Sequence, residues 1–186
     1  MTPVIELWLP ILLSAVLVFA VSSVLHMFTP WHKSDYATVP NQDRVMDALR
    51  PFAIPPGDYM IPRPESMGDM RSAAFKEKMN AGPVIIATVC PNGVMSIGPS
   101  LIRWFIYCCV VGLLAGGVAA SVFPPGTSYH AVFHVVALVA LGGYALALWQ
   151  ASIWLRKSWL TTIKASIDGL VFALLTGGVF GWLWPQ

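Results

Sequence analysis

The chain has 186 residues, of which 56% are hydrophobic and only 11% charged, whereas ordinary soluble domains carry about 25% charged residues. A soluble domain of this length cannot bury so much apolar surface, so the composition predicts an all-α membrane protein with the lipid bilayer as its main partner. The net charge of +2 is too small to indicate binding to nucleic acid, and the three cysteines do not form the pattern of a disulfide framework.

Four apolar runs are long enough for the roughly 20 helical residues that cross a bilayer. Because no water satisfies the backbone inside lipid, we expect all four runs to be helices. The first lies within residues 1–27, and the other three, at about 101–123, 129–154 and 162–184, form a transmembrane region within residues 101–186. The first run carries Glu6, lacks a basic start and is longer than the apolar part of a signal peptide, so it does not resemble a cleaved signal.

The basic residues near the span ends predict how the chain is threaded. With four crossings they all fall on one side of the membrane: Lys33, Arg103, Arg156, Lys157 and Lys164. The opposite side, with both termini and the loop at residues 124–128, contains no Lys or Arg. The positive-inside tendency then predicts an inner (plasma) membrane protein with both termini outside and residues 28–100 in the cytoplasm.

Tryptophans near the span ends fit the same threading, because amphipathic rings prefer the two membrane interfaces. The outer interface is expected to hold Trp8, Trp182 and Trp184, and the inner one Trp31, Trp104, Trp154 and Trp159.

Residues 28–100 are rich in proline and charge and are predicted to form a small cytoplasmic α+β cap between the first two spans. A helix is expected after Pro40, a strand near residues 57–64, a helix from Ser66 to Gly82 with Ser66 and Asp69 at its start, and a strand at residues 83–89. An Asn-Gly pair at residues 92–93 predicts a hairpin turn. We expect helices or a partner to cover the apolar strands.

Two histidines stand four residues apart at the start of the third span, where His130 and His134 share one helix face. They can be two ligands of a metal or haem site on the outer side. The sequence favours the alternative of semi-polar rings at a membrane interface, since a metal site needs further ligands and Glu6 is the only acid on that side.

Asp168 lies about one turn inside the fourth span, and a carboxylate there indicates function by default. One interpretation is proton or cation coupling. The other is an ion pair near the cytoplasmic interface, because Lys164 lies one turn before Asp168 and Arg103 enters the second span at similar depth.

A third group of polar residues, His26, His32 and Asp35, lies where the first span leaves the membrane. It is either a binding site for a metal or substrate, or a solvated junction. Small residues form a further pattern: Gly112 with Gly116, and Gly177 with Gly181, are two G-x-x-x-G pairs that predict tight helix packing.

The sequence contains no P-loop, G-x-G-x-x-G, H-E-x-x-H, G-x-S-x-G or C-x-x-C motif, so it does not indicate an enzyme or specify a cofactor. We therefore expect an accessory or interaction subunit, with a homo-oligomer or another membrane protein as partner. The alternatives are a small oligomeric transporter or channel that uses Asp168, and a metal or redox protein that uses His130 and His134.

Overall fold

The computed structural model describes all 186 residues and divides them into two compact units. The first, called the helical unit, comprises Met1–Tyr36 and Ser96–Gln186. The second, called the middle unit, is Ala37–Met95. Residues 28–36 therefore belong with the helices rather than with the segment between the first two spans, which matters for the site described below.

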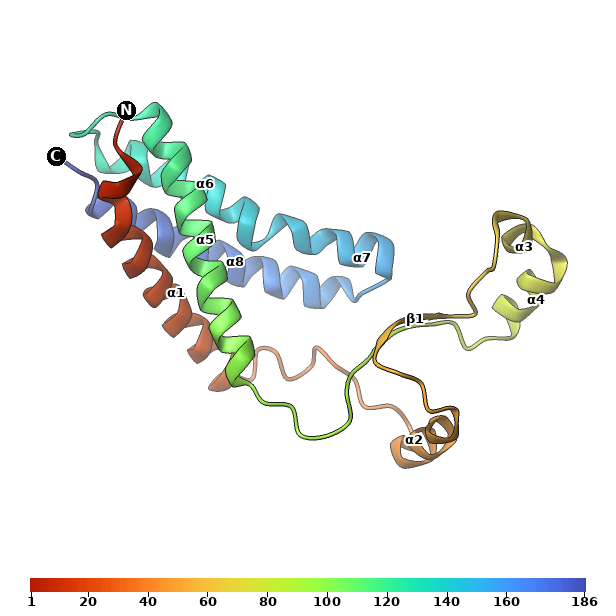
Figure 1. Ribbon diagram of the computed structural model, residues 1–186. Coiled ribbons are helices and arrows are strands. Elements are labelled where there is room, and N and C mark those ends of the chain that lie inside the picture. Colours follow the sequence, from red (N-terminus) through yellow and green to blue (C-terminus); the bar gives the residue numbers. More distant parts are fainter. The chain divides into compact units, whose positions relative to one another are not determined.

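The helical unit contains four helical segments that are long and apolar enough to cross a membrane, as predicted (Figure 1). The first joins a 3-10 turn, η1 (Val4–Leu7), to α1 (Trp8–Met27), and the second is α5 (Gly98–Val122). The third consists of α6 (Tyr129–Tyr144), η3 (Leu146–Leu148) and α7 (Trp149–Leu155), and the fourth is α8 (Trp159–Trp182). By length and composition these segments indicate a multi-pass membrane protein.

Both termini lie at one end of the helical unit, beside the connection between α5 and α6 (Figure 1). The Thr2 amide donates to the carbonyl of Ala120 at 3.1 Å, and the Gly126 amide donates to the carbonyl of Pro185 at 2.8 Å. We call this the terminal end, and the opposite end, where α1 ends and α8 begins, the polar end. The four helical segments therefore alternate in direction, which is the arrangement that four crossings require.

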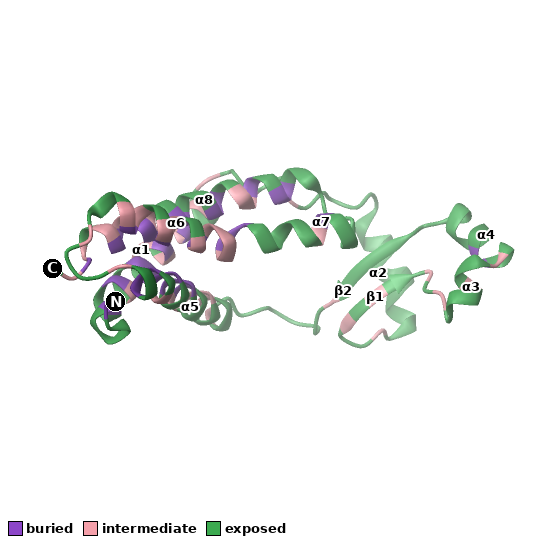
Figure 2. Cartoon of the chain, turned by 90° about the horizontal axis from the view of Figure 1, so that it is seen from above, coloured by how far each residue is buried: buried purple, intermediate pink, exposed green.

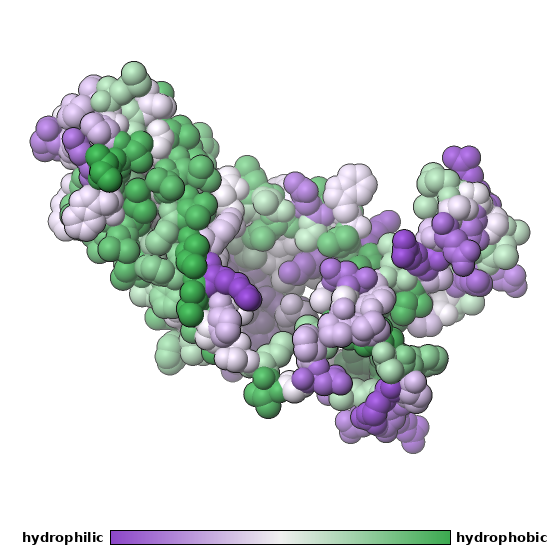
Figure 3. All heavy atoms as spheres, viewed as in Figure 1, coloured by the Kyte–Doolittle hydropathy of each residue, from purple (hydrophilic) through white to green (hydrophobic).

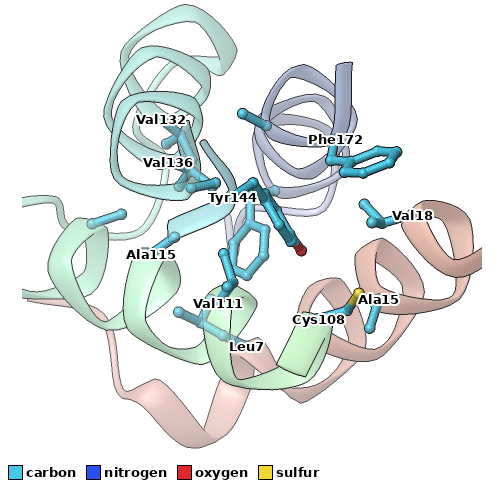
Figure 4. Close-up of a cluster of buried hydrophobic side chains, with 14 of the residues drawn as sticks. Leu7, Ala15, Val18, Cys108, Val111, Ala115, Val132, Val136, Tyr144 and Phe172 are labelled. Carbon is cyan, nitrogen blue, oxygen red and sulfur yellow. The ribbon is translucent and has the colours of Figure 1, made fainter. Parts of the chain in front are cut away.

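The core between the helices combines many small and medium side chains with aromatic rings such as Tyr144 and Phe172 (Figure 4). Ala115, Val132 and Val136 are fully buried, whereas Leu12 and Leu174 are exposed on outer helix faces. Burial is confined to the inward faces (Figure 2), and the visible outer surface of α1 and α5 is largely hydrophobic (Figure 3). Exposed apolar surface on this scale is suited to lipid contact.

The glycines of the two G-x-x-x-G pairs all lie at close contacts within this one chain. A Cβ on Gly116 would lie 2.6 Å from the Phe180 ring, and one on Gly181 would lie 2.8 Å from the Tyr129 ring. A Cβ on Gly177 would lie 2.9 Å from a backbone oxygen of α6, and one on Gly112 would lie 3.4 Å from a hydroxyl of α1. Because these contacts are internal, the pattern gives no support to an oligomer.

The third span, predicted over residues 129–154 with Gly142 and Gly143 interrupting it, is broken directly after these glycines. Regular helix ends at Tyr144, and Ala145 leaves helical geometry with φ −121° and ψ −49°. The Tyr107 hydroxyl of α5 donates to the carbonyl of Gly143 at 2.6 Å, which supplies a partner near the break. Gly169 of α8 allows close approach here, because a Cβ on it would lie 2.9 Å from the Ala145 Cβ.

Two of the tryptophans predicted at the interfaces are packed against other parts of the protein. Trp184 is only 2% exposed, and its indole N–H donates to the carbonyl of Pro124 at 3.1 Å. Trp104 is partly buried and donates to the Ser22 hydroxyl at 2.8 Å. The indole N–H groups of these two rings therefore have acceptors inside the protein.

The middle unit is a small α+β segment. Its elements are α2 (Gln42–Leu49), η2 (Arg50–Phe52), β1 (Gly57–Ile61), α3 (Met67–Arg71), α4 (Ala73–Ala81) and β2 (Ile85–Val89). The strands pair antiparallel from Gly57 opposite Val89 to Ile61 opposite Ile85. The hairpin predicted at residues 92–93 is wrong, because β2 pairs with β1, which precedes it in the chain.

Two serine caps explain why the helix predicted from Ser66 to Gly82 is two helices. The Ser66 hydroxyl accepts from the Asp69 amide at 3.1 Å, which confirms the predicted start, and the Ser72 hydroxyl accepts from the Phe75 amide at 3.0 Å. Ser72 therefore begins a second helix. Phe75 is the one buried residue of the middle unit, so a cover for its strands stays a prediction.

Candidate functional site

The polar end of the helical unit brings together five polar residues that are far apart in the sequence. His26 lies in the last turn of α1, His32 and Asp35 lie in the loop that follows, and Lys164 and Asp168 lie in the first three turns of α8. The loop folds back because Pro30 stops the helix and short backbone hydrogen bonds, Lys33 N–H to the Pro30 carbonyl and Asp35 N–H to the His32 carbonyl, form turns.

His32 lies between two carboxyl groups. Its Nδ1 is 2.6 Å from Asp35 Oδ2, and its Nε2 is 2.7 Å from Asp168 Oδ2. Since a carboxylate can only accept hydrogen bonds, two ionised partners require both ring nitrogens to carry a proton. The imidazole can therefore hold a proton between a carboxylate in the loop and a carboxylate inside the fourth span.

Lys164 ties the loop to α8. Its ammonium group donates to the Trp31 carbonyl and the Ser34 hydroxyl, both at 2.8 Å, and lies 3.4 Å from Asp35 Oδ1. It also lies 5.5 Å from the centre of the Trp31 ring, within range of a cation–π contact. Lys164 is 8% exposed, so these partners replace the water that the ammonium loses on burial.

The predicted ion pair between Lys164 and Asp168 is therefore not formed. Spacing along α8 placed the two side chains on one face, but the returning loop supplies each of them with another partner: Asp35 for the lysine and His32 for the aspartate. Arg103, the third member of the predicted group, is exposed on α5 and makes no ion pair.

The charges around Asp35 lower its pKa. Burial acts to raise the pKa of this carboxyl, but the hydrogen bonds and positive charges of His32 and Lys164 outweigh burial and bring the pKa below its ordinary value of 3.8. Asp35 is therefore ionised at neutral pH and is the group that orients His32.

His26 completes the cluster from α1. Its ring stacks on His32 with centroids 4.2 Å apart and planes 10° apart, and its Nδ1–H donates to the Ser22 carbonyl at 2.9 Å. One ligand-type atom from each of His26, His32 and Asp168 lies within 4.8 Å of the other two. These are the residues of the structure that can hold a metal ion together.

A pocket of about 370 Å³ opens beside this cluster, within the helical unit. Its apolar wall includes Met27, Leu101, Trp104, Tyr144, Leu148 and Phe172. Its polar groups include Ser22, Ser23, His26, Ser100 and Asp168. The Tyr144 ring enters the space between the helices, with Phe172 of α8 nearby (Figure 4). A mainly apolar cavity with a few polar groups at one side is typical of small-molecule sites.

His130 and His134 are not part of this site. Both are exposed on α6, close to the terminal end, and His130 and His134 each lie edge-on to a neighbouring aromatic ring of the same helix. The structure brings no third histidine, cysteine or carboxylate to them. A metal or haem there would need ligands from outside the protein, and that function stays a prediction.

Sequence reasoning found all five charged or histidine residues of the cluster but treated them as two separate groups. It missed Ser22, Trp104 and Tyr144. A serine and a tryptophan in apolar spans do carry a signal, because each polar group needs a partner in lipid. This signal predicts that a hydrogen-bond partner exists but does not identify the partner. Only the structure shows that Trp104 donates to Ser22.

Comparisons with protein-family models, with characterised proteins and with solved structures found no match to this chain.

Proposed function

We propose that the helical unit binds a small, mainly apolar molecule that enters from the bilayer, with the polar group of that molecule held at His26 and Asp168. The observation that carries this proposal is the pocket at the polar end, where an apolar cavity of about 370 Å³ meets a buried carboxylate. Roughly 300–1,000 Å³ is the usual size of a ligand pocket.

The two sides of the pocket fit the two parts of such a ligand. Trp104 and Phe172 offer aromatic faces for an apolar body, and their rings pack with centroids 5.9 Å apart. Asp168 is 4% exposed and its Oδ2 is held by His32, so the carboxylate is fixed before a ligand arrives. A fixed polar group selects ligands more strongly than a mobile one, because less order is lost on binding.

The predicted interaction role has weaker support in the structure. The glycine pairs do not indicate a partner, because they are used for contacts inside the chain. The transporter role remains a prediction: Asp168 lines a pocket at the polar end of the helices.

Ligand extraction from matched variants tests the proposal. Ala165 is half-buried in the pocket wall, so Ala165→Trp fills the cavity, whereas Ile167→Trp adds the same ring on the exposed face of α8. The proteins are purified in mild detergent, and solvent extracts are compared by mass spectrometry. We expect a lipid-soluble compound at near-equal molar amount with wild type and Ile167→Trp, and at least a tenfold loss with Ala165→Trp.

Equal amounts of every extracted compound in the two tryptophan variants would contradict the proposal. Thermal unfolding of each variant in the same detergent shows whether the fold is intact, so loss of the compound is not confused with loss of the protein.

A further inference from the structure

We infer that His26, His32 and Asp168 form a binding site for a divalent transition-metal ion of the zinc type. Two imidazoles and one carboxylate are a ligand set that zinc accepts, with a fourth position left for water or a substrate. The three side chains come from α1, the following loop and α8, and one ligand-type atom from each lies within 4.8 Å of the others. The inference does not depend on a ligand in the pocket.

The hydrogen bonds at Nδ1 of the two histidines are the strongest support for a metal site. A metal-bound histidine nearly always donates its other ring N–H to a carboxylate or a backbone carbonyl, which fixes the ring and its tautomer. His32 Nδ1 is held by Asp35, and His26 Nδ1–H donates to the Ser22 carbonyl. In both rings the nitrogen left for a metal is therefore Nε2, and both outer partners are already in place.

The inner side of the cluster can open to admit the ion. Ligand atoms around a tetrahedral zinc ion lie about 3.3 Å apart, given metal–ligand distances of about 2.0–2.1 Å. His32 Nε2 and Asp168 Oδ2 are 2.7 Å apart, so they must separate by about 0.6 Å. The exposed His26 ring, which is stacked on His32 with planes 10° apart, must turn so that its Nε2 points at the same position. The ion then takes the place of the proton between His32 Nε2 and Asp168 Oδ2, and that proton leaves to solvent.

Charge and surroundings also favour a cation here. Asp35 and Asp168 bring two carboxylates to the cluster, and Lys164 is directed away from Asp168 toward Asp35 and the loop carbonyl of Trp31. Burial of Asp168 lowers the local dielectric constant, which strengthens its attraction for a positive ion. The geometry of Lys164 therefore leaves Asp168 available.

The pocket gives the ion an open side. His26 and Asp168, two of the three ligands, are also lining residues of the pocket. A metal held by them has its free position toward the cavity, where an oxygen atom of a bound molecule can reach it. This is the arrangement of a site that binds substrate and not of a closed structural zinc site.

Metal titration of the full chain tests the inference. The protein is purified without a polyhistidine tag, stripped with a chelator and titrated with Zn²⁺, and with Co²⁺ whose visible spectrum reports tetrahedral nitrogen and oxygen ligands. We expect one Zn²⁺ per chain, and at least tenfold weaker binding in His26→Ala and Asp168→Asn. His26 is exposed and is not part of the His32–Asp168 contact, so His26→Ala is the variant least prone to misfold.

The second histidine pair provides the matched control. His130→Ala and His134→Ala each remove an exposed imidazole from a span and are expected to leave Zn²⁺ affinity unchanged. The inference is overturned if wild type binds no Zn²⁺, if His26→Ala binds it as well as wild type, or if the His130 or His134 variant loses it. None of these results bears on the extraction experiment with the pocket variants.

Discussion

The two ends of the helical unit are held together in different ways. At the terminal end, glycines such as Gly177 and Gly181 bring α8 against α6 with no space for a Cβ. At the polar end, the contact between α8 and the segment after α1 consists of buried charges, with Lys164 and Asp168 each bound to the loop. The hydrogen bonds at the terminal end join backbone and uncharged groups, such as the Gly126 amide and the Pro185 carbonyl, whereas the polar end is joined by charged side chains.

The difference indicates where function lies. Glycine contacts position helices without any polar group, so the bundle has a means of assembly that needs no charge. A buried ion network is costly to desolvate, and well-packed apolar residues of similar volume often match it in stability. Under the proposed function the network at Asp168 serves binding rather than stability, and its place beside the pocket agrees with that.

Removal of Lys164 should have the largest effect on stability. Lys164→Met keeps the length of the side chain but leaves Asp35 without one of its two cationic partners and the Trp31 carbonyl without its donor. Breaking a buried pair from one side costs about 3 kcal/mol or more. Thermal unfolding in detergent should show this loss, while Lys157→Met, at an exposed lysine between α7 and α8, should differ little from wild type.

A double variant sharpens that test. With Asp35→Asn added to Lys164→Met, no unpaired carboxylate remains at position 35, and part of the lost stability should return. If Asp35→Asn lowers the free energy of unfolding as much in the Lys164→Met background as it does in wild type, the two side chains are not energetically coupled.

Glycine-to-alanine changes near the terminal end should have an intermediate effect on stability. Whether the change stabilises or destabilises depends on the space at that position. Gly177→Ala places a Cβ 2.8 Å from the Ala137 Cβ and 2.9 Å from the Phe133 carbonyl, so the helices must move apart. Overpacking of this kind costs about 1–3 kcal/mol. Gly117→Ala, in α5, meets nothing within 4 Å and should be neutral or stabilising by up to about 1 kcal/mol, as alanine favours helix.

Unfolding measurements on the two alanine variants check this pair. Equal destabilisation by both would mean that close helix contact at Gly177 is not what holds the terminal end. Loss of stability only in Gly177→Ala would support packing by shape.

Much of the fold was predictable because each span carries its own signal. A run of about 20 apolar residues defines a helix without knowledge of its neighbours. The break at Ala145 was not predictable from Gly142 and Gly143 alone, since it depends on contact with Gly169 of α8 and on the Tyr107 hydroxyl. Features that need two distant segments were the ones that sequence reasoning missed.

The site shows the same limit. The i, i+4 spacing of Lys164 and Asp168 correctly predicted that both lie on one helix face. It could not show that a loop 130 residues earlier would supply each of them with another partner. His32 and Asp35 were recognised as a cluster, and Asp168 as a buried acid, from their types and positions. The two hydrogen bonds by which His32 joins Asp35 to Asp168 are tertiary contacts, and no local sequence pattern predicts them.

The smallest expected effect concerns the interrupted third span, which forms one wall of the pocket. Tyr107→Phe removes the hydroxyl that donates to the Gly143 carbonyl at 2.6 Å but leaves the ring and its packing against Tyr144. Hydrogen bonds between membrane helices contribute about 0.6 kcal/mol on average. Unfolding should therefore detect only a small loss, and Tyr36→Phe, which removes an exposed hydroxyl with no partner, should show none.

Hydrogen exchange at the break is the more direct measurement. If the Tyr107 hydroxyl fixes the interruption, amides of residues 144–149 should exchange faster in Tyr107→Phe than in wild type, while those of α1 should not change. Unchanged exchange at residues 144–149 would mean that the close approach of Gly169 is sufficient to hold the break. The pocket wall at Tyr144 and Leu148 would then be held in place by the close packing of Gly169 against Ala145 and not by the Tyr107 hydrogen bond.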